Sequence, residues 1–146
     1  MLLLGLRNTS EQVVPVGGNV NFGTVYHRYC KKYNGVKTFD SNGLGVSLQQ
    51  SGIYQITITA TFTTPTAGDV TLEIYENGLP TGVLATETIT TADTESRSIA
   101  LDYFALVNSG CVLGNLTTLA ELITLVNTSD VVATITNVVF NVVKVV

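Results

Sequence analysis

The stretch SGIYQITITATFTTPTAGDVTLEIYENG, residues 51–78, alternates between apolar and polar side chains in two successive runs. In the first run an apolar residue stands at every second position, and threonine fills most positions between. The apolar positions are Tyr54, Ile56, Ile58, Ala60 and Phe62. This period of two, with β-branched residues on the polar face, predicts a β-strand and not a helix. Pro65 and Gly68 break the pattern, and Asn77-Gly78 predicts a tight turn after a second strand.

The rest of the chain repeats this pattern of short alternating runs separated by turn residues. Further strands are expected at residues 20–33, 37–40, 45–49, 82–90, 98–107, 121–127 and 131–146. Residues 115–127 also fit an apolar helical stripe, and periodicity leaves helix and strand open there; we interpret the segment as strand because strands surround it. The sequence therefore predicts one all-β domain, a jelly-roll β-sandwich of about ten antiparallel strands.

Composition limits the classes of partner. Charged residues make up 12% of the 146 residues, the net charge is −4, and hydrophobic residues make up 45%. So little charge indicates that part of the surface is buried against copies of the same chain. A net negative chain without a large basic cluster argues against nucleic-acid binding. No apolar run reaches the roughly 20 residues of a membrane span. Residues 1–10 lack the features of an export signal, so synthesis in the bacterial cytoplasm is expected.

The last predicted strand, residues 131–146, becomes apolar on both faces. Val138, Phe140 and Val142 share one face, whereas Val139 and Val143 share the other. A strand that is apolar on both faces lies between two apolar layers. In a two-layer sandwich, one of these layers is expected to come from outside the protomer, and a symmetric oligomer would supply it.

Three pieces of the sequence together resemble a known family. They are SGIYQITITATF at 51–62, LEIYENG at 72–78, and the closing LITLVNTS and ITNVVFNVVKV at 122–129 and 135–145. In this order they resemble the jelly roll shared by the complement subcomponent q head and tumour necrosis factor, in its bacterial and bacteriophage branch. The resemblance covers residues from about 20 to the C-terminus and implies a homotrimer.

The resemblance also implies where the trimer forms, because in this family the two strands matching 52–62 and the C-terminus lie at the threefold axis. The interface residues expected on these strands are Tyr54, Gln55, Thr57, Thr59, Val138, Val139, Phe140, Val142 and Val143. Residues 20–146 would form the jelly roll. Residues 1–19 would form an arm, either a strand or a docking segment, and no collagen-like tract precedes the jelly roll. The arm is expected to dock onto a capsid or other virion protein through Leu2, Leu3, Leu4 and Leu6.

Few residues could take part in catalysis, metal binding or redox chemistry. The single histidine, His27, stands three residues from Cys30, which places the two on opposite faces of a strand. Cys30 and Cys111 fit no metal or redox spacing, and a disulfide between them stays open. We therefore expect no catalytic site, cofactor or metal. Tyr26, Tyr29 and Tyr33 fit either a sugar-stacking platform or packing against another subunit.

Two functions follow from these expectations. The first is a non-enzymatic structural virion protein of a bacteriophage, either a trimeric head decoration or a head-fibre component. The alternative is a trimeric carbohydrate- or receptor-binding module on a phage tail or on a bacterial or spore surface. In that case surface glycans would be bound by an exposed loop that contains Asp93, Thr94, Glu95 and Arg97.

Overall fold

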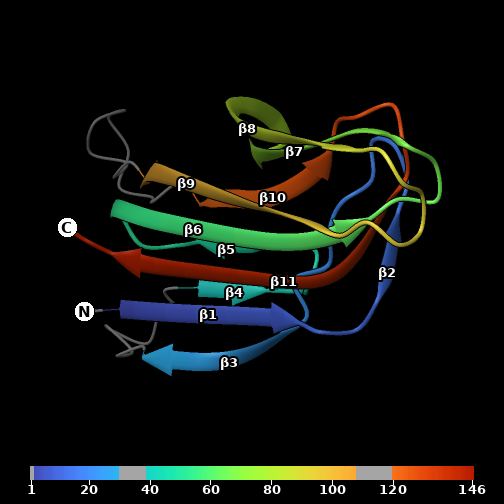
Figure 1. The fold of residues 1–146 in the computed structure, drawn as a ribbon. Coiled ribbons are helices and arrows are strands. Elements are labelled where there is room, and N and C mark those ends of the chain that lie inside the picture. The colour runs from blue at the N-terminus through green and yellow to red at the C-terminus, as the bar shows by residue number, and fades with distance from the viewer. Residues whose placement is uncertain (1, 30–38, 108–119) are drawn as a thin grey trace.

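Eleven β-strands make up the regular structure in a computed structural model of the protein (Figure 1), which describes residues 2–29, 39–107 and 120–146. The strands are β1 (Leu2–Asn8), β2 (Gln12–Val14), β3 (Thr24–Tyr29), β4 (Phe39–Ser41), β5 (Val46–Leu48), β6 (Gly52–Thr63), β7 (Gly68–Glu76), β8 (Leu79–Ile89), β9 (Arg97–Val107), β10 (Glu121–Asn127) and β11 (Ala133–Lys144). Over these three ranges no helix is present, and thus none that is long and apolar enough to cross a membrane. The predicted all-β class is confirmed.

The strands form two antiparallel sheets that face each other. The first sheet has the order β3-β1-β11-β6-β9, with β2 paired to the start of β11. The second sheet has the order β4-β5-β10-β7-β8. In Figure 1 the first sheet lies in front, with β9 at the top and β3 at the bottom. Neighbours in both sheets are mostly distant in sequence, which is the topology of a jelly roll and not of a meander.

The core lies between the two sheets and corrects one expectation about the C-terminal strand. Val138, Phe140 and Val142 are fully buried within one protomer, and the Phe140 ring lies 4.8 Å from that of Phe22. Tyr54 on β6 is also fully buried there. The assignment of these four side chains to the trimer interface is therefore wrong. The second sheet, and not a neighbouring subunit, covers this face of β11.

The N-terminal segment is integrated into the first sheet. Strand β1 pairs with β11 on one side and β3 on the other, and it places Leu4 beside Val142 and Leu6 beside Phe140. Leu4 and Leu6 are only 3% and 1% exposed, so the prediction that they dock onto a shell is wrong. Alternate side chains of a strand point to one face, and here that face is the core. Leu2 and Leu3 are half-buried, and docking of residues 1–19 through them stays a prediction.

The sequence left open whether residues 115–127 form a helix or a strand, and the structure describes residues 121–127 of this segment. They form β10, which pairs with β5 and β7 and points Ile123 and Leu125 into the core. The strand interpretation is confirmed over this range. Residues 115–119, as well as Cys30, Tyr33 and Cys111, lie outside the described residues.

A buried asparagine fastens the corner between β10 and β11. The side-chain amide of Asn127 donates to the carbonyls of Val14 and Val131, at 3.2 and 2.9 Å. Its carbonyl oxygen accepts hydrogen bonds from the backbone N–H of Ser129, at 3.1 Å, and from the Ser129 hydroxyl. Asn127 is fully buried, so these bonds replace all the water that its amide would otherwise bind.

Candidate functional site

The outer face of the first sheet carries exposed apolar side chains at one end. Because Tyr54 and Ala105 point into the core, their neighbours Ile53, Phe104 and Leu106 point outward. Phe104 is 59% exposed and Leu106 is 54% exposed. Ile53 lies opposite Leu106 in the pairing of β6 with β9, so the three form one apolar patch. The C-terminal residues are held at its margin, since the N–H of Val145 donates to the carbonyl of Ile53 at 2.8 Å.

Polar side chains occupy the middle of this outer face. Thr57 lies between Asn141 of β11 and Asp102 of β9 in the sheet register. The Asn141 carboxamide oxygen accepts a hydrogen bond from the hydroxyl of Tyr26, at 2.7 Å. The Tyr26 ring lies directly over Gly5, where a β-carbon would approach a ring carbon to 2.8 Å. Tyr26 therefore covers β1 and is not a free platform for a sugar.

Five of the predicted interface residues do lie on the outer face. Val143 stands opposite Gln55, and Val139 stands opposite Thr59, with Thr57 between them on β6. The apolar patch beside them was missed at the sequence level. Its signal was present in residues 98–107, where the side facing away from the core becomes apolar at Phe104 and Leu106.

No protein-family model and no curated protein matches the sequence, but solved structures match the fold. The globular domain of zebrafish complement 1qA aligns with a TM-score of 0.67 at 9% identity, over 100% of this chain and 98% of that one. The fold of this chain is thus similar to the jelly roll of complement 1q and tumour necrosis factor domains. Murine APRIL aligns with a TM-score of 0.63 at 14% identity, over 99% and 98% of the two chains. The PRD1 vertex protein P5 aligns with a TM-score of 0.51 at 18% identity, over 97% and 93%. The fold predicted from the sequence resemblance is confirmed.

The loop predicted to recognise a ligand, residues 91–97, is held by its own carboxylate. Glu95 Oε2 accepts hydrogen bonds from the backbone N–H groups of Thr91 and Thr90, at 2.9 and 2.5 Å, and Oε1 pairs with Arg97 at 2.8 Å. Glu95 therefore fixes the shape of the loop. Asp93 and Thr94 are exposed on it, and recognition through this loop stays a prediction.

The hydrogen bonds that hold the loop at residues 91–97 should be lost in strong acid, when Glu95 is protonated. The hydrogen bond from the Thr91 N–H, followed by those from Arg97 and Thr90, lowers the pKa of Glu95 from 4.5 to about 2. A depressed folded-state pKa adds stability above the unfolded value, and this stability is lost as pH falls from 4.5 through about 2. We expect a carbon-detected NMR titration to place the Glu95 midpoint near pH 2, and Arg97→Gln to raise it. A midpoint near 4.5 in the wild type would contradict this arrangement, whereas Thr94→Ala should leave the midpoint unchanged.

Three titratable groups, Glu76, Tyr103 and Glu121, form a cluster between the edges of the two sheets. The Tyr103 hydroxyl on β9 donates to the Glu76 carboxylate on β7, and Asn77 donates to the Glu121 carboxylate on β10. Burial, together with the nearby Glu76 charge, raises the pKa of Glu121. Burial and the hydrogen bond to Glu76 raise the pKa of Tyr103 to about 12.

Among the described residues, no group of three or more histidine, cysteine or acidic side chains could hold a metal ion. His27 lies exposed on β3 with its ring against Tyr26.

Proposed function

We propose that this chain is a non-enzymatic structural protein of a bacteriophage virion that assembles as a homotrimer. The observation that carries the proposal is the apolar patch of Ile53, Phe104 and Leu106 on the outer face of the first sheet. The sequence resemblance implies threefold assembly through this sheet, and the alignment with a phage vertex protein supports a virion role. Head decoration and head fibre are the two forms that this role would take.

Burial of the patch would stabilise such a trimer. Removing one Leu or Phe side chain from water contributes roughly 1.5–3 kcal/mol. Phe104 and Leu106 each expose more than half of their surface in the protomer, so three copies would supply six such side chains. Thr57, Thr59 and Gln55 beside the patch carry no charge, so burying them costs less than burying ionised side chains, provided that they form hydrogen bonds across the contact.

Light scattering after size exclusion tests the assembly. At micromolar concentration we expect a mass of three times 15.5 kDa for the wild type, and of 15.5 kDa for Leu106→Asp. A buried, unpaired carboxylate costs several kcal/mol per subunit and repels its two copies. The matched control is Leu84→Asp, since Leu84 is a 49% exposed leucine on β8 of the other sheet. The assembly is rejected by a monomeric wild type, or by equal dissociation in both variants.

The virion role has a separate test in the genome. Neighbouring genes for a capsid or portal protein would support it, and a neighbouring gene for a collagen-like stalk would contradict it.

The alternative function, a trimeric binding module on a phage tail or on a bacterial or spore surface, would use the same trimer. A groove on the second sheet is the observation that favours a binding role.

A further inference from the structure

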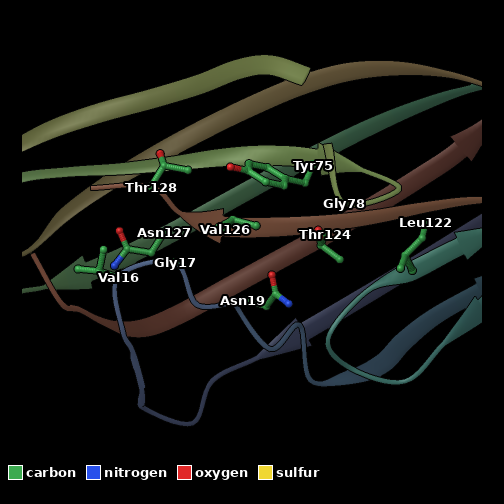
Figure 2. A pocket seen from close by; sticks show the side chains of 10 residues that line it. All are labelled: Val16, Gly17, Asn19, Tyr75, Gly78, Leu122, Thr124, Val126, Asn127 and Thr128. Carbon is green, nitrogen blue, oxygen red and sulfur yellow. The ribbon is translucent and has the colours of Figure 1, made fainter. Parts of the chain in front are cut away.

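A groove runs along the outer face of the second sheet, on the opposite side of the sandwich from the apolar patch. Its floor is formed by β10 and β7, and its sides by the loop at residues 15–19 and by the β7–β8 turn at Gly78 (Figure 2). Its volume is about 510 Å³. This lies within the range of small-molecule sites, and it suits one or two sugar rings.

The two sides of the groove are fixed by the backbone. On one side, the N–H of Gly17 donates to the carbonyl of Asn127, and the N–H of Asn127 donates to the carbonyl of Gly18, at 2.8 and 3.0 Å. On the other side, the N–H of Leu122 donates to the Asn77 side chain at 2.8 Å, and the N–H of Asn77 donates to the carbonyl of Leu122 at 2.9 Å. A ligand would therefore enter a preformed site and would not have to order a loop.

The lining combines an aromatic ring with neutral polar groups. Figure 2 shows Tyr75 of β7 beside Val126 and Thr124 of β10, with Asn19 on the facing loop. Tyr75 stands directly opposite Thr124 in the register of the second sheet. The side chains of Tyr75, Asn19, Thr124 and Thr128 make no hydrogen bond to any other residue in the described part of the chain. They thus keep three hydroxyls and one carboxamide available to a ligand.

The charge of the lining selects the class of ligand. No charged side chain stands among the described residues that line the groove. An ionic ligand would lose its hydration there without gaining a counter-charge, whereas a neutral polyol would exchange water for the hydroxyl and amide groups. The face of Tyr75, with Val16 and Leu122 at the ends of the groove, offers apolar contact to the C–H side of a sugar ring.

The geometry points to this groove as a binding site for a neutral saccharide. Tyr75 stacks against the sugar ring, and Asn19, Thr124 and Thr128 bind its hydroxyl groups. The site is complete within one protomer and does not depend on the proposed trimer. If the first sheet does form a trimer, the three grooves face away from that contact, and their combined binding to a glycan surface exceeds that of one groove.

A glycan array and an NMR titration test the site. We expect the wild-type protein to bind neutral oligosaccharides on an array that also carries sialylated ones. Titrating the leading neutral trisaccharide into labelled protein should shift the amide signals of residues 16–19, 75 and 122–128. Absence of neutral glycan binding, or shifts confined to residues 91–97, would overturn the proposal.

Variants separate stacking from a general loss of structure. Tyr75→Ala should weaken the affinity about tenfold or more, whereas Tyr75→Phe keeps the ring and should weaken it less. Tyr29→Ala is the control, because Tyr29 is an exposed tyrosine on β3 of the other sheet. Equal losses in Tyr75→Ala and Tyr29→Ala would contradict the site. Leu106→Asp should keep the affinity of each protomer even when assembly is lost, so failure of the trimer and failure of the groove give different results.

Discussion

A Phe140→Ala variant is expected to lose about 3–5 kcal/mol of the free energy of unfolding, the cost of a large cavity in a well-packed core. Phe140 is fully buried between the sheets, and its ring packs against Phe22 at a centroid distance of 4.8 Å. Its neighbours in the sheet register, Leu6 on β1 and Ile58 on β6, are buried as well, so no side chain from solvent can fill the space. Chemical denaturation followed by circular dichroism measures the loss.

The design must separate folding from assembly. Both the wild type and Phe140→Ala are therefore compared in the Leu106→Asp background, where the protomers are expected to be apart. The matched control is Phe104→Ala in the same background, because Phe104 is a phenylalanine that is 59% exposed. It should change the unfolding free energy by no more than about 0.5 kcal/mol. If Phe140→Ala left the unfolding free energy unchanged in this background, and dissociated the oligomer when introduced into the wild type, Phe140 would lie at the axis after all.

Asn127→Ala should cost about 2–4 kcal/mol, although it removes no apolar surface. The variant removes the amide donor to the carbonyls of Val14 and Val131, and it removes the acceptor for two groups of Ser129. The Val131 carbonyl keeps one side-chain donor, the Ser129 hydroxyl at 3.1 Å, whereas the Val14 carbonyl keeps none. Each buried polar group that loses its partner costs about 1–3 kcal/mol, and partial relaxation of the corner keeps the total below the sum. Because Val14 belongs to β2, the loss should also loosen the pairing of β2 with β11.

Two further variants test whether the loss of stability comes from the hydrogen bonds of Asn127. Asn42→Ala is the control, since Asn42 is exposed and its side chain accepts one hydrogen bond, from the N–H of Leu44. It should cost less than about 1 kcal/mol. Asn127→Asp keeps the acceptor oxygen but loses the donor, so it should remain strongly destabilised. Thermal denaturation and amide hydrogen exchange at residues 12–14 measure both effects. Equal stability of Asn42→Ala and Asn127→Ala would show that the corner is held by other contacts.

The sequence was sufficient for the fold class because alternation is a local signal. Tyr54 to Phe62 form a strand where the period of two predicted it. Glu121 to Asn127 also form a strand, although there the prediction rested on the surrounding strands and not on the period. The alternation did not show which face of the last strand points into the core. Its two faces carry Phe140 and Val142 on one side and Val139 and Val143 on the other, so no polar face marks the solvent side. Only the packing of β11 on the second sheet distinguishes them.

The local sequence pattern also could not predict which distant strands pair, or which side chains bind the backbone of their own loop. The leucines of residues 2–6 look like a free apolar arm, because nothing near them in sequence shows that β1 pairs with β11. Glu95 resembles any exposed loop acid until the turn, with Asp93 at φ 65°, brings the N–H groups of Thr90 and Thr91 to its carboxylate. The groove joins residues 16–19, 75 and 122–128, which come together only in the folded chain.

The pairing of the first strand with the last also has a practical consequence. Leu2 lies opposite Lys144, and both chain ends leave the same end of the sandwich, on the left in Figure 1. A short linker could join them without crossing either sheet. A tag on the C-terminus would emerge beside Ile53, so purification handles are better kept away from that end when assembly is to be measured.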